Sequence, residues 1–166
     1  MILNRQRGTR VPIHSLDRFA AKASELLRLP ADSITICLVS DAEMARWNRA
    51  YRRKNRPTDV LSFPADASRP KADGGRRKRQ SGGKSKTASR SNSKSEEENG
   101  RRYLGDIAIA PAVARRNALR SRRRFEDEMR ILILHGMLHL MGYDHETDSG
   151  QMDRRERKLR RSLRLE

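Results

Sequence analysis

The chain has 166 residues, a length that fits one domain with a hydrophobic core of its own. Its 38 Lys and Arg against 21 Asp and Glu give a net charge of +17, which indicates a polyanionic partner such as nucleic acid, although a basic surface can also be simply solvated. No apolar stretch approaches the length of a membrane span, residues 1–10 carry no signal-peptide pattern, and the single Cys37 excludes an internal disulfide and is typical of a buried thiol in a reducing compartment.

The first part of the chain predicts alternating strands and helices. Periodicity and turn residues favour an edge strand within Met1–Gln6, an amphipathic helix over Ser15–Arg28, an inner strand over Ser33–Val39, a helix from Ser40 to about Tyr51, and a short strand over Asp59–Phe63 between two prolines. Ser40 and Glu43 have the spacing of a capping box. In the helix that follows, we expect Met44, Trp47 and Tyr51 to face the core and the arginines to face outward.

Residues 67–102 differ in character from the rest of the chain. They contain no Leu, Ile, Val, Met, Phe or Trp, and they carry 12 Lys and Arg against 4 Asp and Glu. Such a segment cannot bury enough apolar surface to offset the entropy lost on ordering, so we expect it to be disordered. Two roles stay open for this basic insertion: a nucleic-acid-binding arm or a tolerated surface insertion.

The second part of the chain predicts one strand and three helices. The strand covers Leu104–Ala110, Pro111 opens a helix to about Ser121, a second helix covers Phe125–Met141, and the last one covers about Ser149–Leu165. The helix over Phe125–Met141 is apolar on all sides in its middle, so we expect it to be central and buried. The last helix places Met152, Glu156, Leu159 and Leu163 on one stripe.

Three of the four histidines in the chain lie close together, in the pattern H-x-x-x-H-x-x-G-x-x-H. His135 and His139 are four residues apart, so on a helix they share one face. Gly142 is suited to end that helix, and the turn can then bring His145 back as a third ligand. Packed core histidines are the alternative, but three imidazoles with an open fourth position are typical of a catalytic zinc site.

The residue after the first histidine narrows the chemistry of such a site. Zinc proteases with this spacing carry a glutamate there as general base, whereas this chain has Gly136. A peptidase would therefore lack its base, and the sequence disfavours proteolysis.

Three blocks of the sequence resemble the YbeY family of metal-dependent endoribonucleases, which are ribosomal RNA maturation factors. They are Asn48-x-x-Tyr51-Arg52 leading into Pro57–Pro64, then Leu104–Ile107, then His135–His145. The resemblance covers nearly the whole chain except the basic insertion, which is longer and more basic than the family usually carries.

The resemblance implies an α+β fold for one domain over residues 1–166, with a small mixed sheet of about four strands, about five helices and a central metal-bearing helix. It also implies one zinc ion bound by His135, His139 and His145, with Arg52 and His135 as catalytic residues. The expected activity is cleavage of single-stranded RNA in the cytoplasm, in maturation of the 16S ribosomal RNA 3′ end and in quality control of the small ribosomal subunit.

A zinc ion with an open position can activate water and polarise a phosphoryl oxygen, and the Arg52 guanidinium can bind a phosphate in bidentate fashion. Asp144, Asp59 and Asp106 are each candidates either for orienting a ligand imidazole or for structural hydrogen bonds. Two other functions stay open: a different zinc metallohydrolase, and a ribosome-associated RNA-binding module whose zinc is structural.

Overall fold

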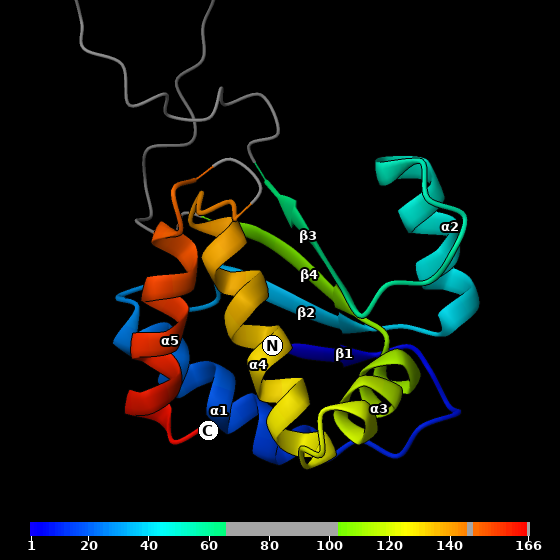
Figure 1. Ribbon diagram of the computed structural model, residues 1–166, viewed down its shortest axis with the longest axis horizontal. Helices are drawn as coiled ribbons and strands as arrows, with labels where there is room; N and C mark the ends of the chain where they lie inside the picture. Colours follow the sequence, from blue (N-terminus) through cyan, green and yellow to red (C-terminus); the bar gives the residue numbers. More distant parts are fainter. Residues whose placement is uncertain (66–102, 146–147, 166) are drawn as a thin grey trace, which may run out of the picture.

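The computed structural model describes residues 1–65, 103–145 and 148–165. Within these residues the chain forms a four-stranded mixed sheet and five helices, which confirms the predicted α+β fold (Figure 1). The basic insertion, expected to be disordered, lies outside the described residues.

The sheet combines parallel and antiparallel pairs in the order β1-β2-β4-β3. Strands β1 (Ile2–Asn4), β2 (Ile34–Leu38) and β4 (Gly105–Ile109) run parallel, and β3 (Val60–Pro64) pairs antiparallel with β4. Strand β3 therefore forms one edge of the sheet. Its pairing with β4 runs from Val60 opposite Ile109 to Pro64 opposite Gly105.

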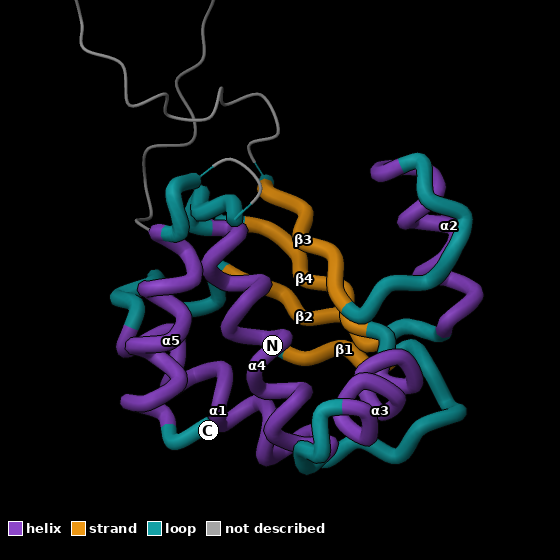
Figure 2. The backbone as a smooth tube through the Cα atoms, viewed as in Figure 1, coloured by secondary structure: helices purple, strands orange, loops and turns teal. Residues whose placement is uncertain are grey.

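The five helices of the described chain are unequally distributed around the sheet, as Figure 2 shows. They are α1 (Ile13–Leu26), α2 (Asp41–Arg52), α3 (Pro111–Arg120), α4 (Phe125–Leu140) and α5 (Gln151–Leu163). Helix α4 is central, because it contacts α1, α3 and α5 as well as β3 and β4. Helix α2 stands apart from the others, beyond β3 (Figure 1).

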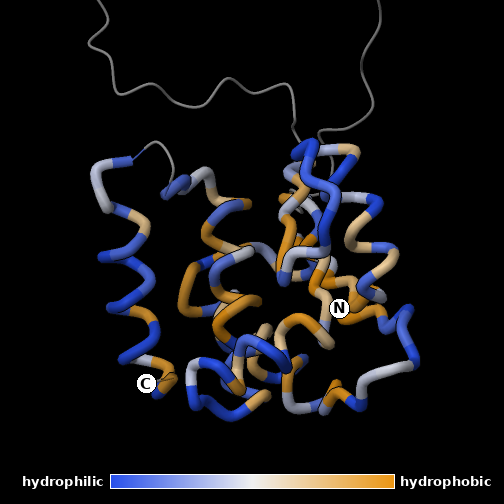
Figure 3. Tube along the Cα trace, turned by 45° about the vertical axis from the view of Figure 1, so that its right-hand side comes forward, coloured by the Kyte–Doolittle hydropathy of each residue, from blue (hydrophilic) through white to orange (hydrophobic). Residues whose placement is uncertain are grey.

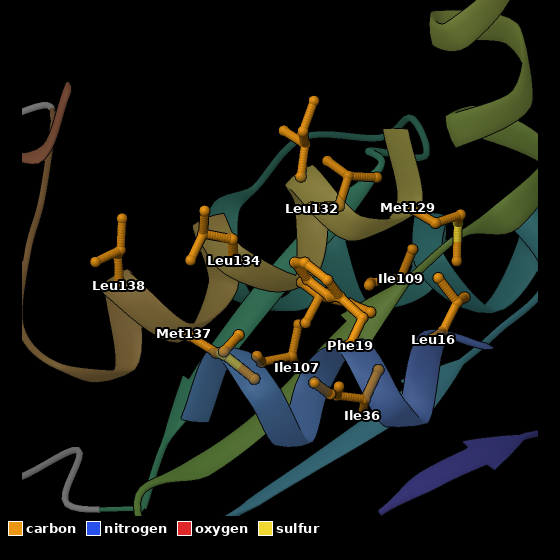
Figure 4. Close-up of a cluster of buried hydrophobic side chains, with 14 of the residues drawn as sticks. Leu16, Phe19, Ile36, Ile107, Ile109, Met129, Leu132, Leu134, Met137 and Leu138 are labelled. Carbon is orange, nitrogen blue, oxygen red and sulfur yellow. The ribbon is translucent and has the colours of Figure 1, made fainter. Parts of the chain in front are cut away.

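The main core lies between α4, α1 and one face of the sheet (Figure 4). Leu134 and Leu138 of α4 are fully buried, and so is Ile107 of β4. Residues 131–134 of α4 are buried on successive positions, which confirms that this helix is enclosed on several sides. A helix held this firmly is a rigid carrier for side chains at its end.

A smaller core lies on the other face of the sheet, beneath α2. It consists of buried residues from β2–α2, β3 and β4, namely Val39, Met44, Leu61, Ala108 and Ala110. Trp47 and Phe63 pack against this cluster from its partly exposed rim. Ser40 caps α2 by accepting a hydrogen bond from the Glu43 backbone N–H at 3.2 Å, as the capping-box spacing predicts.

One predicted core position is wrong. Tyr51 was expected to face the core together with Met44, but its side chain is 68% exposed. The buried stripe of α2 runs instead through Met44 and Asn48, whose amide donates to the Arg56 carbonyl at 2.7 Å. Tyr51, one turn further along α2, contacts only the partly exposed Phe63 among the described aromatic residues, with ring centroids 4.9 Å apart.

Two predicted helices begin and end elsewhere. Helix α1 begins two residues early, directly after Pro12, and ends at Leu26 because Arg28 adopts a left-handed conformation with φ 56°. Helix α5 is shorter than expected at both ends. At its C-terminal end, a left-handed Arg164 stops it after Leu163.

Among the described residues, no helix is both long and apolar enough to cross a membrane.

Candidate metal centre

The three clustered histidines converge at the C-terminal end of α4. His135 and His139 lie one turn apart on α4, with ring centroids separated by 4.7 Å. The ring of His145 lies 5.4 Å from that of His135 and 5.3 Å from that of His139. One ring nitrogen from each residue lies within 4.8 Å of the other two. The structure thus brings together all three residues predicted from the spacing.

A local turn returns the chain so that His145 can join the other two. The Gly142 N–H donates to the His139 carbonyl at 2.9 Å, and the Tyr143 N–H donates to the Leu138 carbonyl at 3.1 Å. This pair of bonds defines a Schellman motif, which requires a left-handed residue after the helix. Gly142 supplies it with φ +92°. The partly buried Tyr143 packs on the main core and anchors the turn.

His135 is oriented by a glutamate from the neighbouring helix. Its Nδ1 lies 3.0 Å from a carboxylate oxygen of Glu156 on α5. Burial raises the pKa of Glu156, but the hydrogen bond from His135 and the nearby Arg160 outweigh burial, so the net pKa lies below the usual value. An ionised carboxylate only accepts hydrogen bonds, so Nδ1 of His135 carries a proton, and this is the tautomer whose Nε2 can bind a metal ion.

The surroundings of His139 favour its neutral form. Burial lowers its pKa, and the neighbouring imidazoles of His135 and His145 lower it further. A hydrogen bond to the Tyr143 backbone acts in the opposite direction without reversing the shift. Neutral imidazole is the form that binds metal ions.

These donors fit a transition-metal ion. The Nε2 atoms of His135 and His139 face each other at 3.1 Å. Ring nitrogens that bind one tetrahedral zinc ion at 2.0–2.1 Å lie about 3.3 Å apart, so the observed spacing is close to that of two ligands of the same ion. A cation between two such lone pairs also relieves their repulsion. The three histidines are therefore a candidate metal site.

Gly136 lies in close contact with the sheet. A Cβ at this position would come within 2.7 Å of the Ile107 side chain, which is itself fully buried. The Gly136 carbonyl also accepts a hydrogen bond from the Ser62 hydroxyl of β3 at 3.3 Å. The position where zinc proteases carry their glutamate is thus packed against β4 and has no room for a side chain.

The predicted Arg52 lies in a different layer from the histidines. It ends α2, and its side chain is exposed. Helices α2 and α4 pack on opposite faces of β3, because Phe63 contacts the α2 aromatic residues while Ser62 contacts α4. Strand β3 therefore contacts both α4, which carries His135 and His139, and α2, which carries Arg52.

The three candidate aspartates have different surroundings. The Asp144 carboxylate lies 4.0 Å from Nδ1 of His145, within ion-pair range but beyond hydrogen-bond length. Asp59 accepts from the Val60 N–H at 2.9 Å and from the Asn117 amide at 3.0 Å. These bonds tie the start of β3 to α3.

Asp106 accepts a hydrogen bond from the Tyr103 hydroxyl at 2.7 Å on the sheet face away from α4. Asp59 and Asp106 therefore make structural hydrogen bonds, the second of the two roles predicted for them, and do not orient an imidazole.

The sequence predicts that Glu156 shares a stripe of the last helix with Met152 and Leu159, but it does not connect Glu156 with the histidines. A signal was present, since a glutamate on a stripe with Met152 and Leu159 must have a partner when it is buried. That partner, His135, is 21 residues away in the sequence, and no local pattern identifies it.

The chain is similar to known proteins over nearly its whole length. A family model described as "Endoribonuclease YbeY" matches residues 2–164. The chain is 33% identical over 165 residues to an endoribonuclease YbeY of Koribacter versatilis, covering 99% of this chain and 86% of that protein. It is 34% identical to one of Solibacter usitatus, covering 91% and 79%. The solution structure of TM1509 from Thermotoga maritima aligns with a TM-score of 0.52 at 25% identity, covering 99% of this chain and 92% of that one.

Proposed function

The chain belongs to the YbeY family of endoribonucleases, and on this premise we propose that it cleaves single-stranded RNA with the help of one zinc ion. The convergence of His135, His139 and His145 carries the proposal. Within the described residues this cluster offers three protein donors, which matches a catalytic site with an open position better than a closed structural one.

The roles of the protein groups follow from their surroundings. His135, His139 and His145 would hold the ion, and Glu156 keeps the proton of His135 on Nδ1 so that Nε2 stays available. When bound, the ion would supply Lewis-acid polarisation of a phosphoryl oxygen and activation of water. Arg52 would bind a non-bridging phosphate oxygen from the opposite layer, and a planar guanidinium does this in bidentate fashion.

The charge of the molecule supports a polyanionic substrate. The net charge is +17, and α5 presents a basic face lined by Arg154, Arg157, Lys158 and Arg161. Figure 3 shows α5, next to the C-terminus, as a mainly hydrophilic helix. As the finer part of the proposal, we infer that the substrate is precursor ribosomal RNA of the small subunit, including the 16S 3′ end, and that the protein acts in the cytoplasm.

The proposal is tested with a metal assay and an RNA cleavage assay on the same preparations. The wild-type chain, His139→Ala and His14→Ala are each incubated with a single-stranded RNA whose end carries the precursor sequence of the small-subunit ribosomal RNA. His14 is the matched control, because it is the one histidine outside the cluster and is exposed on α1. We expect the wild type and His14→Ala to bind one zinc ion per chain and to cut the RNA.

We expect His139→Ala to lose both properties while remaining folded. Zinc-loaded wild type that leaves the RNA intact would refute the enzymatic function. Cleavage that survives both chelation and His139→Ala would refute the assignment of the site. Binding of the RNA without metal-dependent cleavage would favour an RNA-binding module with a structural ion.

A further inference from the structure

Three aromatic side chains from α2 and β3 pack together on the sheet face opposite α4. The ring centroid of Phe63 lies 5.8 Å from that of Trp47 and 4.9 Å from that of Tyr51, both in edge-to-face geometry. Trp47 and Phe63 are partly buried, whereas Tyr51 is 68% exposed. We call this group the aromatic platform. Its inner two members belong to the core, and its outer member presents a ring to solvent.

The inner part of the platform is held in place from behind. Met44, one turn before Trp47, is fully buried, and Trp47 packs against the small core beneath α2. The Arg5 guanidinium lies 6.0 Å from the Trp47 ring centroid and forms an ion pair with Glu43 at 2.9 Å. Tyr51 therefore rests on a fixed support, and a rigid aromatic ring loses little entropy when a partner stacks on it.

The surroundings of the platform carry positive charge. Between Met44 and Thr58 the chain has six Lys and Arg and no Asp or Glu. Arg49 and Arg53, two residues before and two after Tyr51 in the sequence, are exposed. An exposed aromatic ring on a basic segment is a combination with which proteins bind single-stranded nucleic acid, because the ring stacks on a base and the cations neutralise the phosphates.

Strand β3 connects the platform to the helix that carries the histidines. Ser62 of β3 donates to the carbonyl of Gly136, the residue after His135, and the next strand residue, Phe63, is itself a member of the platform. Because β3 is the edge strand, a polymer that crosses this edge can contact both sites. A small substrate would use only one of them.

From these observations we propose that the aromatic platform binds an unpaired base of the RNA strand, stacked on Tyr51, while Arg49 and Arg53 contact the flanking phosphates. The proposal rests on the proposed RNA substrate and adds a second binding subsite beside the metal centre. It commits to single-stranded RNA as the occupant because of the charge around Tyr51. A protein partner or a second copy of the chain is the competing occupant.

Trp47 makes the proposal measurable without a label, because it is the only tryptophan of the chain and lies in the platform. The full chain, prepared without added metal, is titrated with a 2′-O-methyl oligoribonucleotide, and Trp47 fluorescence reports binding. Base-free inorganic polyphosphate serves as the matched polyanion. We expect RNA to change the fluorescence and polyphosphate to leave it nearly unchanged.

Variants then test the stacking contribution. We expect Tyr51→Ala to weaken RNA binding roughly 5- to 150-fold, the range that corresponds to loss of one base stack, and Tyr51→Phe to stay within about twofold of the wild type. Leu119→Ala is the control for removing an exposed apolar side chain, since Leu119 is 74% exposed on α3. We expect unchanged RNA affinity for it. Thermal melting of each variant verifies that the fold is intact.

Three outcomes would overturn the proposal. They are equal RNA affinity for Tyr51→Ala and Leu119→Ala, equal fluorescence responses to RNA and polyphosphate, and a self-association that Tyr51→Ala abolishes while RNA affinity stays unchanged. Failure of the nuclease function is distinguishable from all three. An intact chain that binds RNA through Tyr51 but never cuts it refutes the enzyme and leaves the subsite standing.

Discussion

At the scale of single residues, Glu156 orients His135, one of the three clustered histidines. It accepts a hydrogen bond from Nδ1 of His135 at 3.0 Å, and Arg160 contacts its other oxygen. The carboxylate side chain is only 8% exposed, so it has no solvent partner to replace these two. Its negative charge makes the bound imidazole a better electron donor, which is how carboxylates behind metal-binding histidines raise metal affinity.

We therefore predict that Glu156→Gln weakens zinc binding roughly 10- to 100-fold without unfolding the protein. The amide keeps the shape and one acceptor oxygen of the side chain but loses its charge. Competition with a chromogenic chelator measures the affinity, and thermal melting reports the fold. Glu25→Gln, at an exposed position of α1, is the control. Equal zinc affinity for the two variants would show that Glu156 is only a packing residue.

Asp148 performs a different task, since its carboxylate organises the start of α5. It accepts the backbone N–H groups of Gly150, Gln151 and Met152 at 2.7, 3.0 and 2.8 Å. The hydrogen bond from Met152, followed by those from Gly150 and Gln151, holds the pKa of Asp148 below its ordinary value. This capping interaction positions the helix that carries Glu156.

A pH dependence follows from this lowered pKa. A carboxyl whose pKa is lower in the folded than in the unfolded chain stabilises the fold above the unfolded value of about 3.9, and this stability is lost as the pH falls through the folded value. We predict that the wild type is more stable than Asp148→Asn at pH 7 and that the difference shrinks below about pH 4. Urea unfolding at several pH values measures it. A difference that stays constant down to pH 2.5 would contradict the prediction.

At the scale of elements, the contact between α4 and β4 determines where the histidines sit. Gly136 lets α4 approach Ile107 so closely that an added Cβ would lie 2.7 Å from that side chain. Ile107 is fully buried between the helix and the sheet, so it has little room to move away. The glycine lies next to His135, and therefore any shift of the helix at this point also displaces the metal ligands.

We predict that Gly136→Ala destabilises the fold despite the better helix propensity of alanine. Overpacking a core costs about 1–3 kcal/mol, whereas replacing a helical glycine with alanine returns about 1 kcal/mol, so the net loss is on the order of 1 kcal/mol. Urea unfolding measures the loss. Ile107→Ala removes the clashing atoms, and Gly136→Ala should cost less in that background. Gly8→Ala, with nothing within 4 Å of the added Cβ, is the control. Equal effects at Gly8 and Gly136 would contradict this explanation.

How far each element follows from the sequence depends on how local its cause is. The histidine cluster was predictable because one helical turn and one glycine bring its members together. Helix α4 was predicted within one residue of its end, since its apolar pattern and Gly142 lie in the same stretch. The exposure of Tyr51 was not predictable, because it depends on how α2 packs against the sheet. The link between Glu156 and His135 likewise required knowing how two helices pack.

At the scale of the whole molecule, the basic insertion of residues 67–102 lies between β3 and β4 in the sequence. Strands β3 and β4 pair residue by residue, with Pro64 opposite Gly105, and the Ala65 N–H donates to the Leu104 carbonyl at 2.9 Å. The described residues Ala65 and Leu104, before and after the insertion, therefore lie side by side. Within the described residues, the three donors of the histidine cluster come from α4 and the turn after it.

We predict that replacing residues 67–102 with a short Gly-Ser linker preserves the fold and the binding of one zinc ion per chain. Closing a much shorter loop costs less entropy, so the shortened chain should be more stable by about 2 kcal/mol. Urea unfolding and the metal assay check both statements. Loss of zinc binding would mean that the insertion contributes to the site.

The same shortened chain distinguishes the two roles left open for the insertion, because 12 Lys and Arg against 4 Asp and Glu lie within it. RNA affinity falls with salt in proportion to the number of phosphates that the protein neutralises. A nucleic-acid-binding arm therefore predicts a shallower salt dependence once the insertion is removed, whereas a tolerated surface insertion predicts an unchanged slope. Measuring affinity between roughly 50 and 200 mM salt separates the two. In either case the contribution of Tyr51 should remain, since the aromatic platform is built by α2 and β3 alone.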